Sequence, residues 1–212
     1  ITSSADGTKL AAVVGNGNIW TSSNSGATWT EDTSVGATKG WRDIAMSNDG
    51  TKLAAVVSSG NIWTSTDSGA SWTAVGPSKY WRGITMSADG TKLAATSNDC
   101  CDNGGVYTSD NSGATWTQSV MTDREMEYIA GSADGTKLAV ADNGGGIKIS
   151  SDSGASWTDV ASDQDWNSIT MSDDGTKMAA ATSNSDGVWV SSDSGSTWNE
   201  VTMKDMRCII SQ

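Results

Sequence analysis

Carboxylates are the side chains of this 212-residue chain best suited to acid–base chemistry. The chain has 25 Asp and Glu, 13 Lys and Arg, and no His. Without His it has no base for a Ser or Cys triad and no imidazole to bind a metal ion. Glycoside hydrolysis needs only two suitably spaced carboxyl groups, so it is the enzyme chemistry that this composition leaves open.

A second candidate for chemistry is a large apolar side chain followed by a polar one, at the start of recurring segments. Aromatic faces beside hydrogen-bonding groups are typical of sites for sugars and extended peptides. The predicted ligand-binding residues are Trp41, Arg42, Trp81, Arg82, Trp166, Asn167 and Arg207, with Met126, Glu127 and Met206 at the matching positions. The alternative interpretation is that these side chains pack between neighbouring repeats and cap a central channel.

Three cysteines could carry redox or metal chemistry, and two of them are adjacent. Cys100 and Cys101 can form a disulfide with each other, pair elsewhere or stay reduced, and the bridged form is our prediction. Only Cys208 remains, and with no His the chain has too few ligands for a zinc site. We therefore predict no metal and no cofactor. A disulfide would suit an extracellular or other extracytoplasmic compartment.

The segments that position these residues belong to a repeat of about 40 residues, the size range of repeat architectures. Each copy is marked by an isoleucine shortly before an Asp-Gly-Thr-Lys turn. These isoleucines are Ile1, Ile44, Ile84, Ile129 and Ile169, and Ile209 begins the pattern again. We number the repeats that start near the first five positions 1 to 5.

Repeat 2 predicts four short strands, at 41–47, 52–57, 61–65 and 70–75, separated by tight turns. No segment shows the 3.6-residue apolar spacing of a helix. Four strands in about 40 residues is typical of a propeller blade. We therefore predict an all-β fold, a five-bladed β-propeller of four-stranded antiparallel blades, as a single domain over 1–212. An open row of repeats and a pair of sandwiches are the alternatives. A last strand at 206–211 either closes the ring on repeat 1 or begins a further blade.

The turn between the third and fourth strands follows one template in all five repeats, Ser-x-Asp-x-Gly-x-Thr/Ser-Trp, with Asn replacing Asp twice. We call these segments the box turns: 22–29, 65–72, 109–116, 150–157 and 191–198. The Asp or Asn oxygen can accept backbone N–H groups, and Gly supplies a conformation that other residues adopt at a cost. We predict structural roles for Asn24, Gly26, Trp29, Asp67, Gly69, Trp72, Asn111, Gly113, Trp116, Asp152, Gly154, Trp157, Asp193, Gly195 and Trp198.

On these residues the chain resembles the Asp-box (bacterial neuraminidase repeat) β-propeller family, across all five repeats. That family includes sialidases, sortilin-type ectodomains, xyloglucan hydrolases and a photosystem II assembly factor propeller. The resemblance implies that the boxes are structural turns away from the ligand face. Sialidases of this kind also need three arginines and a Tyr–Glu nucleophile pair, and the Phe-Arg-Ile-Pro segment that supplies one arginine is missing here. Adjacent Glu127 and Tyr128 would face opposite sides of a strand.

The formal net charge of −12 bears on partners, because an acidic surface repels phosphate backbones and anionic lipids. No segment approaches the roughly 20 apolar residues that span a bilayer. We therefore predict no nucleic-acid binding and no membrane insertion. The predicted function is a non-catalytic structural or protein-interaction propeller, extracytoplasmic and part of a larger assembly. The alternatives are a lectin that uses the Trp and Arg side chains at the strand starts, and a glycosidase.

Overall fold

The computed structural model describes residues 1–36, 38–98, 104–119, 126–183 and 187–201. All regular structure in these ranges is β-strand. Repeats 1 and 2 contain β1 (Thr2–Ser3), β2 (Leu10–Val13), β3 (Gly15–Gly17), β4 (Ile19–Ser22), β5 (Thr30–Asp32), β6 (Lys39–Met46), β7 (Leu53–Val57), β8 (Gly60–Ser65) and β9 (Thr73–Lys79). Repeat 3 contains β10 (Trp81–Met86), β11 (Leu93–Ser97), β12 (Gly105–Ser109) and β13 (Thr117–Gln118). Repeats 4 and 5 contain β14 (Met126–Gly131), β15 (Leu138–Ser150), β16 (Thr158–Met171), β17 (Met178–Thr182), β18 (Val188–Ser191) and β19 (Asn199–Val201).

The strands pair antiparallel in four sheets, which confirms the all-β antiparallel prediction. The sheet orders are β1-β2-β4-β5, β3-β6-β7-β8-β9, β10-β11-β12-β13 and β14-β15-β16-β17-β18-β19. Two sheets differ from the expected four strands. In one, β3 of repeat 1 pairs with β6 of repeat 2. In the last sheet, β15 and β16 each run on without a break. The first part of β15 pairs with β14, and its second part pairs with β16. The second part of β16 then pairs with β17, so one sheet spans repeats 4 and 5.

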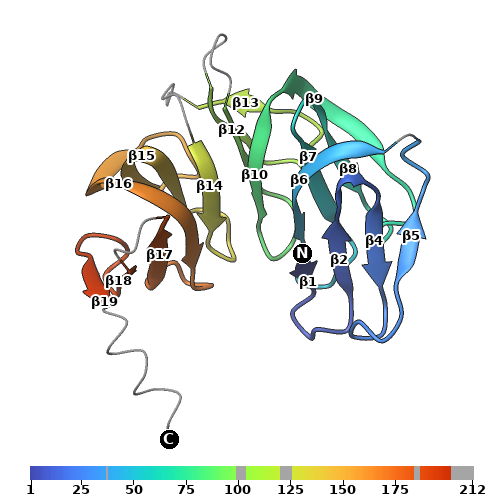
Figure 1. The fold of residues 1–212 in the computed structure, drawn as a ribbon, viewed down its shortest axis with the longest axis horizontal. Helices are drawn as coiled ribbons and strands as arrows, with labels where there is room; N and C mark the ends of the chain where they lie inside the picture. The colour runs from blue at the N-terminus through green and yellow to red at the C-terminus, as the bar shows by residue number, and fades with distance from the viewer. Residues whose placement is uncertain (37, 99–103, 120–125, 184–186, 202–212) are drawn as a thin grey trace, which may run out of the picture.

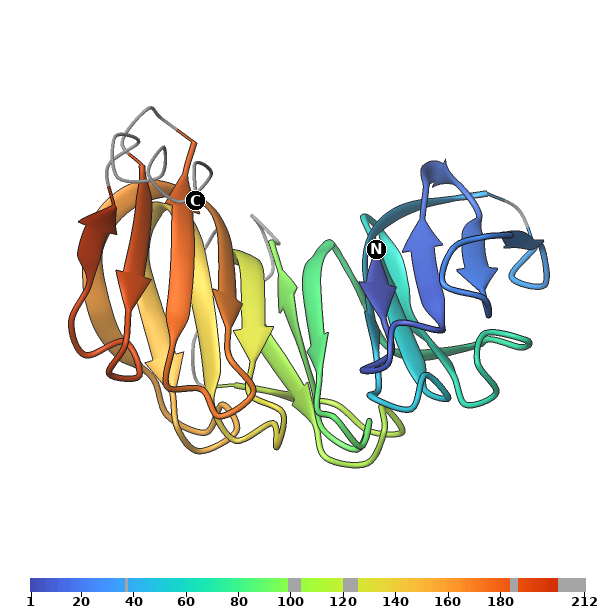
Figure 2. The same ribbon diagram turned by 90° about the horizontal axis from the view of Figure 1, so that it is seen from below.

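The sheets are arranged like a fan, and the first and last repeats lie at opposite ends of it. β1, β6, β10 and β14 lie toward the middle, and β5, β9, β13 and β19 lie at the rim (Figure 1). The view from below shows the same separation of β1–β5 from β17–β19 (Figure 2). Within the described ranges no sheet closes on itself, so these residues form an open arc.

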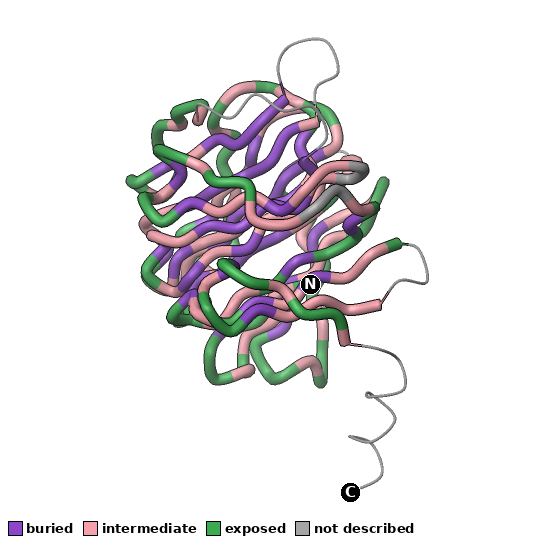
Figure 3. Tube along the Cα trace, turned by 90° about the vertical axis from the view of Figure 1, so that its left-hand side faces the viewer, coloured by how far each residue is buried: buried purple, intermediate pink, exposed green. Residues whose placement is uncertain are grey.

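The core consists of the layers between neighbouring sheets. All five residues of β7 are buried. Leu53, Ala55 and Val57 pack toward repeat 1, while Ala54 and Val56 pack toward repeat 3. β7 is therefore apolar at every position because both of its faces are covered. Figure 3 shows these buried segments running side by side through the molecule, with exposed turns at both ends.

The observed strands of repeat 2 agree with the predicted segments, with one shift. The fourth strand begins at Thr73, after the box tryptophan, and continues to Lys79. The box turn thus includes residues that the alternating pattern had assigned to the strand. In the described ranges, no helix has the length and apolar character needed to cross a membrane.

Candidate functional site

The first strand of repeats 2 to 5 carries a β-bulge at the position where the sequence placed its candidate binding residues. In repeat 2, Trp41 pairs with Val57 and Asp43 with Val56, so Arg42 is an extra residue. Glu127 and Asn167 are the extra residues of β14 and β16. In β10 the interruption spans Arg82 and Gly83, between Trp81 and Ile84. Bulges re-aim side chains and are common beside functional sites.

The bulge also decides which side chains enter the core. Side chains alternate along a regular strand, so Trp41 and Ile44 would lie on opposite faces. One extra residue shifts this alternation, and Trp41, Ile44 and Met46 all pack in the same layer between repeats 1 and 2. The bulge therefore turns the large apolar residue inward and removes the polar residue from the core.

The three tryptophans at the strand starts are consequently inside the protein. Trp41, Trp81 and Trp166 are 3%, 0% and 1% exposed. Trp81 lies edge-on to Tyr107, with ring centroids 5.2 Å apart, and its indole N–H donates to the Gly60 carbonyl at 2.9 Å. This placement differs from the expectation that the rings line a binding face, because the bulge inserts them between the sheets. It matches the packing alternative for the rings.

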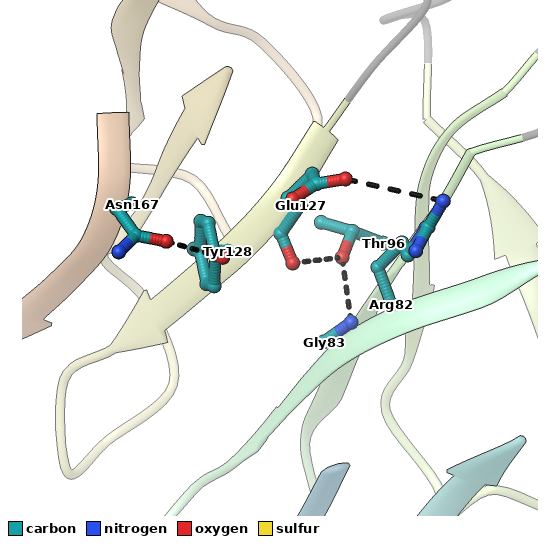
Figure 4. A network of polar contacts seen from close by, with 6 residues as sticks. All are labelled: Arg82, Gly83, Thr96, Glu127, Tyr128 and Asn167. Atoms are coloured by element: carbon teal, nitrogen blue, oxygen red, sulfur yellow. Dashed lines mark hydrogen bonds and ion pairs between the residues drawn. The ribbon is translucent and has the colours of Figure 1, made fainter. Parts of the chain in front are cut away.

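The polar residues of the bulges remain at the surface, and we call Arg42, Arg82, Glu127 and Asn167 the bulge row. Arg42 and Asn167 are exposed, and Arg82 and Glu127 are half-buried. Arg82 and Glu127 point toward each other, with 3.9 Å between Nη2 and Oε1 (Figure 4). The Tyr128 hydroxyl donates to Asn167 Oδ1 at 2.8 Å. Arg207, the remaining predicted residue, lies outside the described residues.

Contacts between repeats hold the bulge row in place. The Thr96 hydroxyl oxygen accepts the Gly83 N–H at 3.0 Å and donates to the Glu127 carbonyl at 3.5 Å (Figure 4). Asp43 accepts the N–H groups of Ile44 at 2.8 Å and Ile84 at 2.9 Å. Burial raises the pKa of Asp43, although both hydrogen bonds oppose that shift. These contacts hydrogen-bond side chains to backbone groups in and beside the bulges.

The electrostatics of the row favour binding through hydrogen bonds and charge. Burial, followed by the nearby Glu127 charge, raises the pKa of Tyr128, which keeps its hydroxyl a donor. Asp43 binds backbone N–H groups, and Glu127 faces Arg82. Arg42 is exposed and its side chain makes no hydrogen bond or ion pair within the described part of the chain, so its guanidinium is accessible to a ligand. In the same ranges, no three His, Cys, Asp or Glu side chains cluster to hold a metal ion.

The box turns use their polar side chains internally. The Ser65 hydroxyl accepts the Gly69 N–H at 2.9 Å and donates to Asp67 at 2.8 Å. Asp67 also accepts the Ser71 N–H at 2.9 Å and the Ser71 hydroxyl at 2.6 Å. The Ser71 hydroxyl is the largest cause of a pKa of about 2 for Asp67. Asn24 accepts the Thr28 N–H in the same way, at 2.9 Å.

One box position was missed by the sequence reasoning. The residue before the box glycine is Ser in all five copies, and it adopts a left-handed conformation. The φ angles of Ser25, Ser68, Ser112, Ser153 and Ser194 lie between 56° and 60°. A serine in this conformation is uncommon. The recurrence of Ser at this position in all five copies is the sequence signal that could have identified its structural role.

A second candidate site is a cavity of about 570 Å³ between repeats 3 and 4. Gly131 lines it, at the position that Met46, Met86 and Met171 occupy in other repeats. Ser119 also lines it, where repeats 2, 4 and 5 have Val. Two of the residues that line this cavity are therefore smaller than their counterparts in other repeats. Its walls are rich in Ser and Thr hydroxyls, with Lys92 and Asp110 among the lining residues. The predicted disulfide residues, Cys100 and Cys101, lie outside the described ranges.

Comparison with solved structures identifies the type of fold. The chain is similar to a Niastella koreensis GH74 enzyme, with TM-score 0.73, 22% identity and coverage of 96% of this chain but 31% of that one. It is similar to YCF48 bound to D1 peptide, with TM-score 0.70, 15% identity and coverage of 94% and 67%. It is also similar to a chain of a nidogen–laminin complex, with TM-score 0.73, 15% identity and coverage of 95% and 78%. The chain thus spans about a third of the GH74 enzyme's length. At these identities the likeness shows a β-propeller type of fold and nothing further. No protein-family model and no curated protein matches the sequence.

Proposed function

We propose that the chain forms five four-stranded blades with Asp-box turns and binds another protein through the bulge row, without catalysing a reaction. The observation that carries this proposal is the arrangement at the strand starts. The rings of Trp41, Trp81 and Trp166 are buried, while charged and amide groups lie on the bulges next to them. Such a surface suits hydrogen bonding and charge pairing with a peptide more than stacking on a sugar ring.

The charge of the row indicates what kind of protein segment it would bind. The chain carries a net charge of −12, so an exposed arginine is a local exception that can pair with a carboxylate. Arginine binds carboxylates through two parallel hydrogen bonds and is frequent among the residues that dominate binding energy. An extended acidic or carbonyl-rich segment across β6, β10, β14 and β16 is the partner that we propose. The fold likeness to YCF48 bound to D1 peptide and to the nidogen–laminin complex supports a protein partner.

A glycan-binding role is the second candidate, and the cavity between repeats 3 and 4 favours it. Its Ser and Thr hydroxyls could hydrogen-bond to a sugar that enters between the sheets. The GH74 likeness gives weak support to a carbohydrate role. An extracytoplasmic location and membership of a larger assembly complete our proposal, and a disulfide between the adjacent cysteines would suit that location.

Peptide binding tests the proposed function. We would measure fluorescence polarisation of three labelled 12-residue peptides that differ only in having acidic, neutral or basic residues at alternate positions. The acidic peptide should bind best, and Arg42→Ala together with Asn167→Ala should weaken it about tenfold, or about 1.4 kcal/mol. Lys177→Ala is the matched control, because it also removes one exposed positive charge but lies beyond the other end of β16.

Two outcomes would contradict the peptide proposal. One is equal binding of all three peptides, and the other is an equal loss with the control variant. A glycan array then tests the second candidate function, glycan binding. Glycan binding that is lost in Gly131→Met but kept in the variant with Arg42→Ala and Asn167→Ala would show that the chain binds a glycan in the cavity.

A further inference from the structure

The cavity between repeats 3 and 4 has Thr and Gly at two positions that are apolar at two other interfaces. Between repeats 2 and 3, Ala45 and Met86 belong to one apolar cluster. Between repeats 4 and 5, the residues at the same two positions also share a cluster, and they are Ala130 and Met171. Between repeats 3 and 4 these positions hold Thr85 and Gly131, and both line the cavity. A hydroxyl and a glycine therefore occupy the place of an Ala and Met pair.

The Thr85 hydroxyl lies beside the space that a side chain at residue 131 would enter. A Cβ on Gly131 would be 3.2 Å from both Cγ2 and Oγ1 of Thr85. Within the described part of the chain, the Thr85 hydroxyl makes no hydrogen bond. Ser119 differs in this respect, because its hydroxyl donates to the Gly154 carbonyl at 2.6 Å and accepts the Trp157 indole N–H at 2.8 Å. Thr85 thus offers the cavity a hydroxyl that the fold does not use.

Thr85 is the first member of a row that crosses the sheet of repeat 3 in register. Thr85 pairs with Ala94, Ala94 with Thr108, and Thr108 with Thr117. Paired residues of neighbouring strands lie on the same face of a sheet, and Ala94 packs toward repeat 4. All four residues line the cavity. Thr85 and Thr108 are half-buried and Thr117 is exposed, so the row runs from inside the cavity toward the rim, where β13 lies (Figure 1).

Thr108 also helps to pack the repeats together, but it does so with its methyl group. A Cβ on Gly154 would lie 2.8 Å from Cγ2 of Thr108. At the interface of repeats 2 and 3, a Cβ on Gly113 would lie 3.0 Å from Cγ2 of Thr64. The hydroxyls of Thr108 and Thr117, like that of Thr85, make no hydrogen bond to the residues that the structure describes. The row therefore presents three hydroxyls on strands that are spaced about 4.8 Å apart.

Lys92 brings a positive charge to the same cavity. It is half-buried, and its Nζ donates to Ser153 Oγ of repeat 4 at 3.3 Å. This contact belongs to a pattern in which a lysine before the second strand reaches the next repeat, as Lys52 Nζ does when it donates to the Asp89 carbonyl at 2.9 Å. The Lys92 ammonium thus already links repeats 3 and 4.

Acidic side chains offset the charge of Lys92. Hydrogen bonds, first from Ser132 and then from Thr136, lower the pKa of Asp134 to about 2, and the Lys92 charge adds to this effect. Asp134 is therefore ionised near Lys92 at neutral pH. Asp110 is exposed and also lines the cavity. An anionic ligand would meet these acidic groups, so the cavity favours an uncharged one.

We propose that this cavity binds an uncharged sugar through the hydroxyls of Thr85, Thr108 and Thr117. The inference rests on the second candidate function, glycan binding, and names its ligand class and contact residues. A hydroxyl both donates and accepts hydrogen bonds, and so does each hydroxyl of a sugar, so the two sets match in either direction. The threonine methyl groups and Leu138 supply apolar contacts for the sugar's C–H groups. The volume of about 570 Å³ lies within the range of roughly 300–1,000 Å³ that is typical of small-ligand pockets.

Calorimetric titration with charged and uncharged trisaccharides tests the proposal. We would titrate the full 212-residue chain with cellotriose, maltotriose and mannotriose as uncharged sugars, trigalacturonate as an anion and the glucosamine trimer as a cation. At least one uncharged trisaccharide should bind, and it should bind more tightly than either charged one. Thr85→Val together with Thr108→Val keeps the shape of both side chains but removes two hydroxyls, so it should weaken that binding about tenfold. Thr64→Val is the matched control, since Thr64 makes the same methyl contact at another interface and does not line this cavity.

A second variant fills the cavity with side chains that the chain already uses elsewhere. Thr85→Ala together with Gly131→Met copies the pair found at two other interfaces, so it should fold and should lose sugar binding. Unchanged binding by the variant with two valines would overturn the inference while leaving glycan binding in place. A charged trisaccharide that binds as tightly as the best uncharged one would do the same. Absence of binding by every trisaccharide would overturn both this inference and the glycan-binding candidate, without affecting the peptide proposal.

Discussion

Replacing Trp81 distinguishes a ring that packs between repeats from a ring that binds a ligand. Trp81 is fully buried, lies against Tyr107 and Trp116, and donates to the Gly60 carbonyl. Removing a buried tryptophan side chain costs about 3 to 5 kcal/mol. At about 2 to 4 °C per kcal/mol for a domain of this size, Trp81→Ala should lower the melting temperature by about 6 to 20 °C.

A second variant separates the ring's volume from its hydrogen bond. Trp81→Phe keeps an aromatic ring but leaves the Gly60 carbonyl without its donor, which should cost about 1 to 3 kcal/mol. Urea denaturation followed by circular dichroism gives both free energies of unfolding. The order of stability should be wild type, then Phe, then Ala.

The same variants refute the packing argument if they behave otherwise. A loss below about 1 kcal/mol for Trp81→Ala would mean that the indole does not fill the layer between repeats 2 and 3. A Trp81→Phe variant that keeps wild-type stability but loses binding to the acidic peptide would mean that the ring contacts the ligand. Either result would favour the original prediction that the Trp81 ring lines a binding face.

Two further predictions concern pH and the cavity. The pKa of Asp67 is lowered to about 2 from 3.8, so its hydrogen bonds stabilise the fold above pH 3.8 and are lost as the pH falls toward 2. Asp67→Asn copies the natural Asn111 box and does not titrate in this pH range. The melting temperature of this variant should therefore fall less between pH 3.8 and pH 2 than that of the wild type. An equal fall in the two proteins would contradict this prediction. Gly131→Met should fill the space between repeats 3 and 4 and raise the free energy of unfolding by about 1 kcal/mol, measured in urea. A destabilised variant would show that Leu138 and Thr85, which would both lie 3.2 Å from a Cβ on residue 131, cannot yield.

The repeat, the antiparallel strands and the turns between them could be predicted from the sequence. These features depend on local chemistry: a two-residue alternation of side chains, glycines at positive φ, and an Asp or Asn that binds the backbone a few residues away. The second strands at 52–57 and their counterparts were recognisable because burial on both faces requires an apolar run. The strand starts of repeats 2 to 5 were recognisable as unusual because a large apolar residue precedes a polar one in each.

Which of those strand-start residues reach the surface depends on the tertiary structure. A single extra residue at Arg42 changes the face on which Trp41 lies, and nothing in the alternating pattern reveals where the partner strand skips it. The continuous β15 and β16, and the lysines that reach the next repeat, likewise depend on how whole sheets lie beside each other. Those lysine contacts join residues that are 37 to 61 positions apart in the chain, as between Lys92 and Ser153, so local sequence preferences cannot specify them.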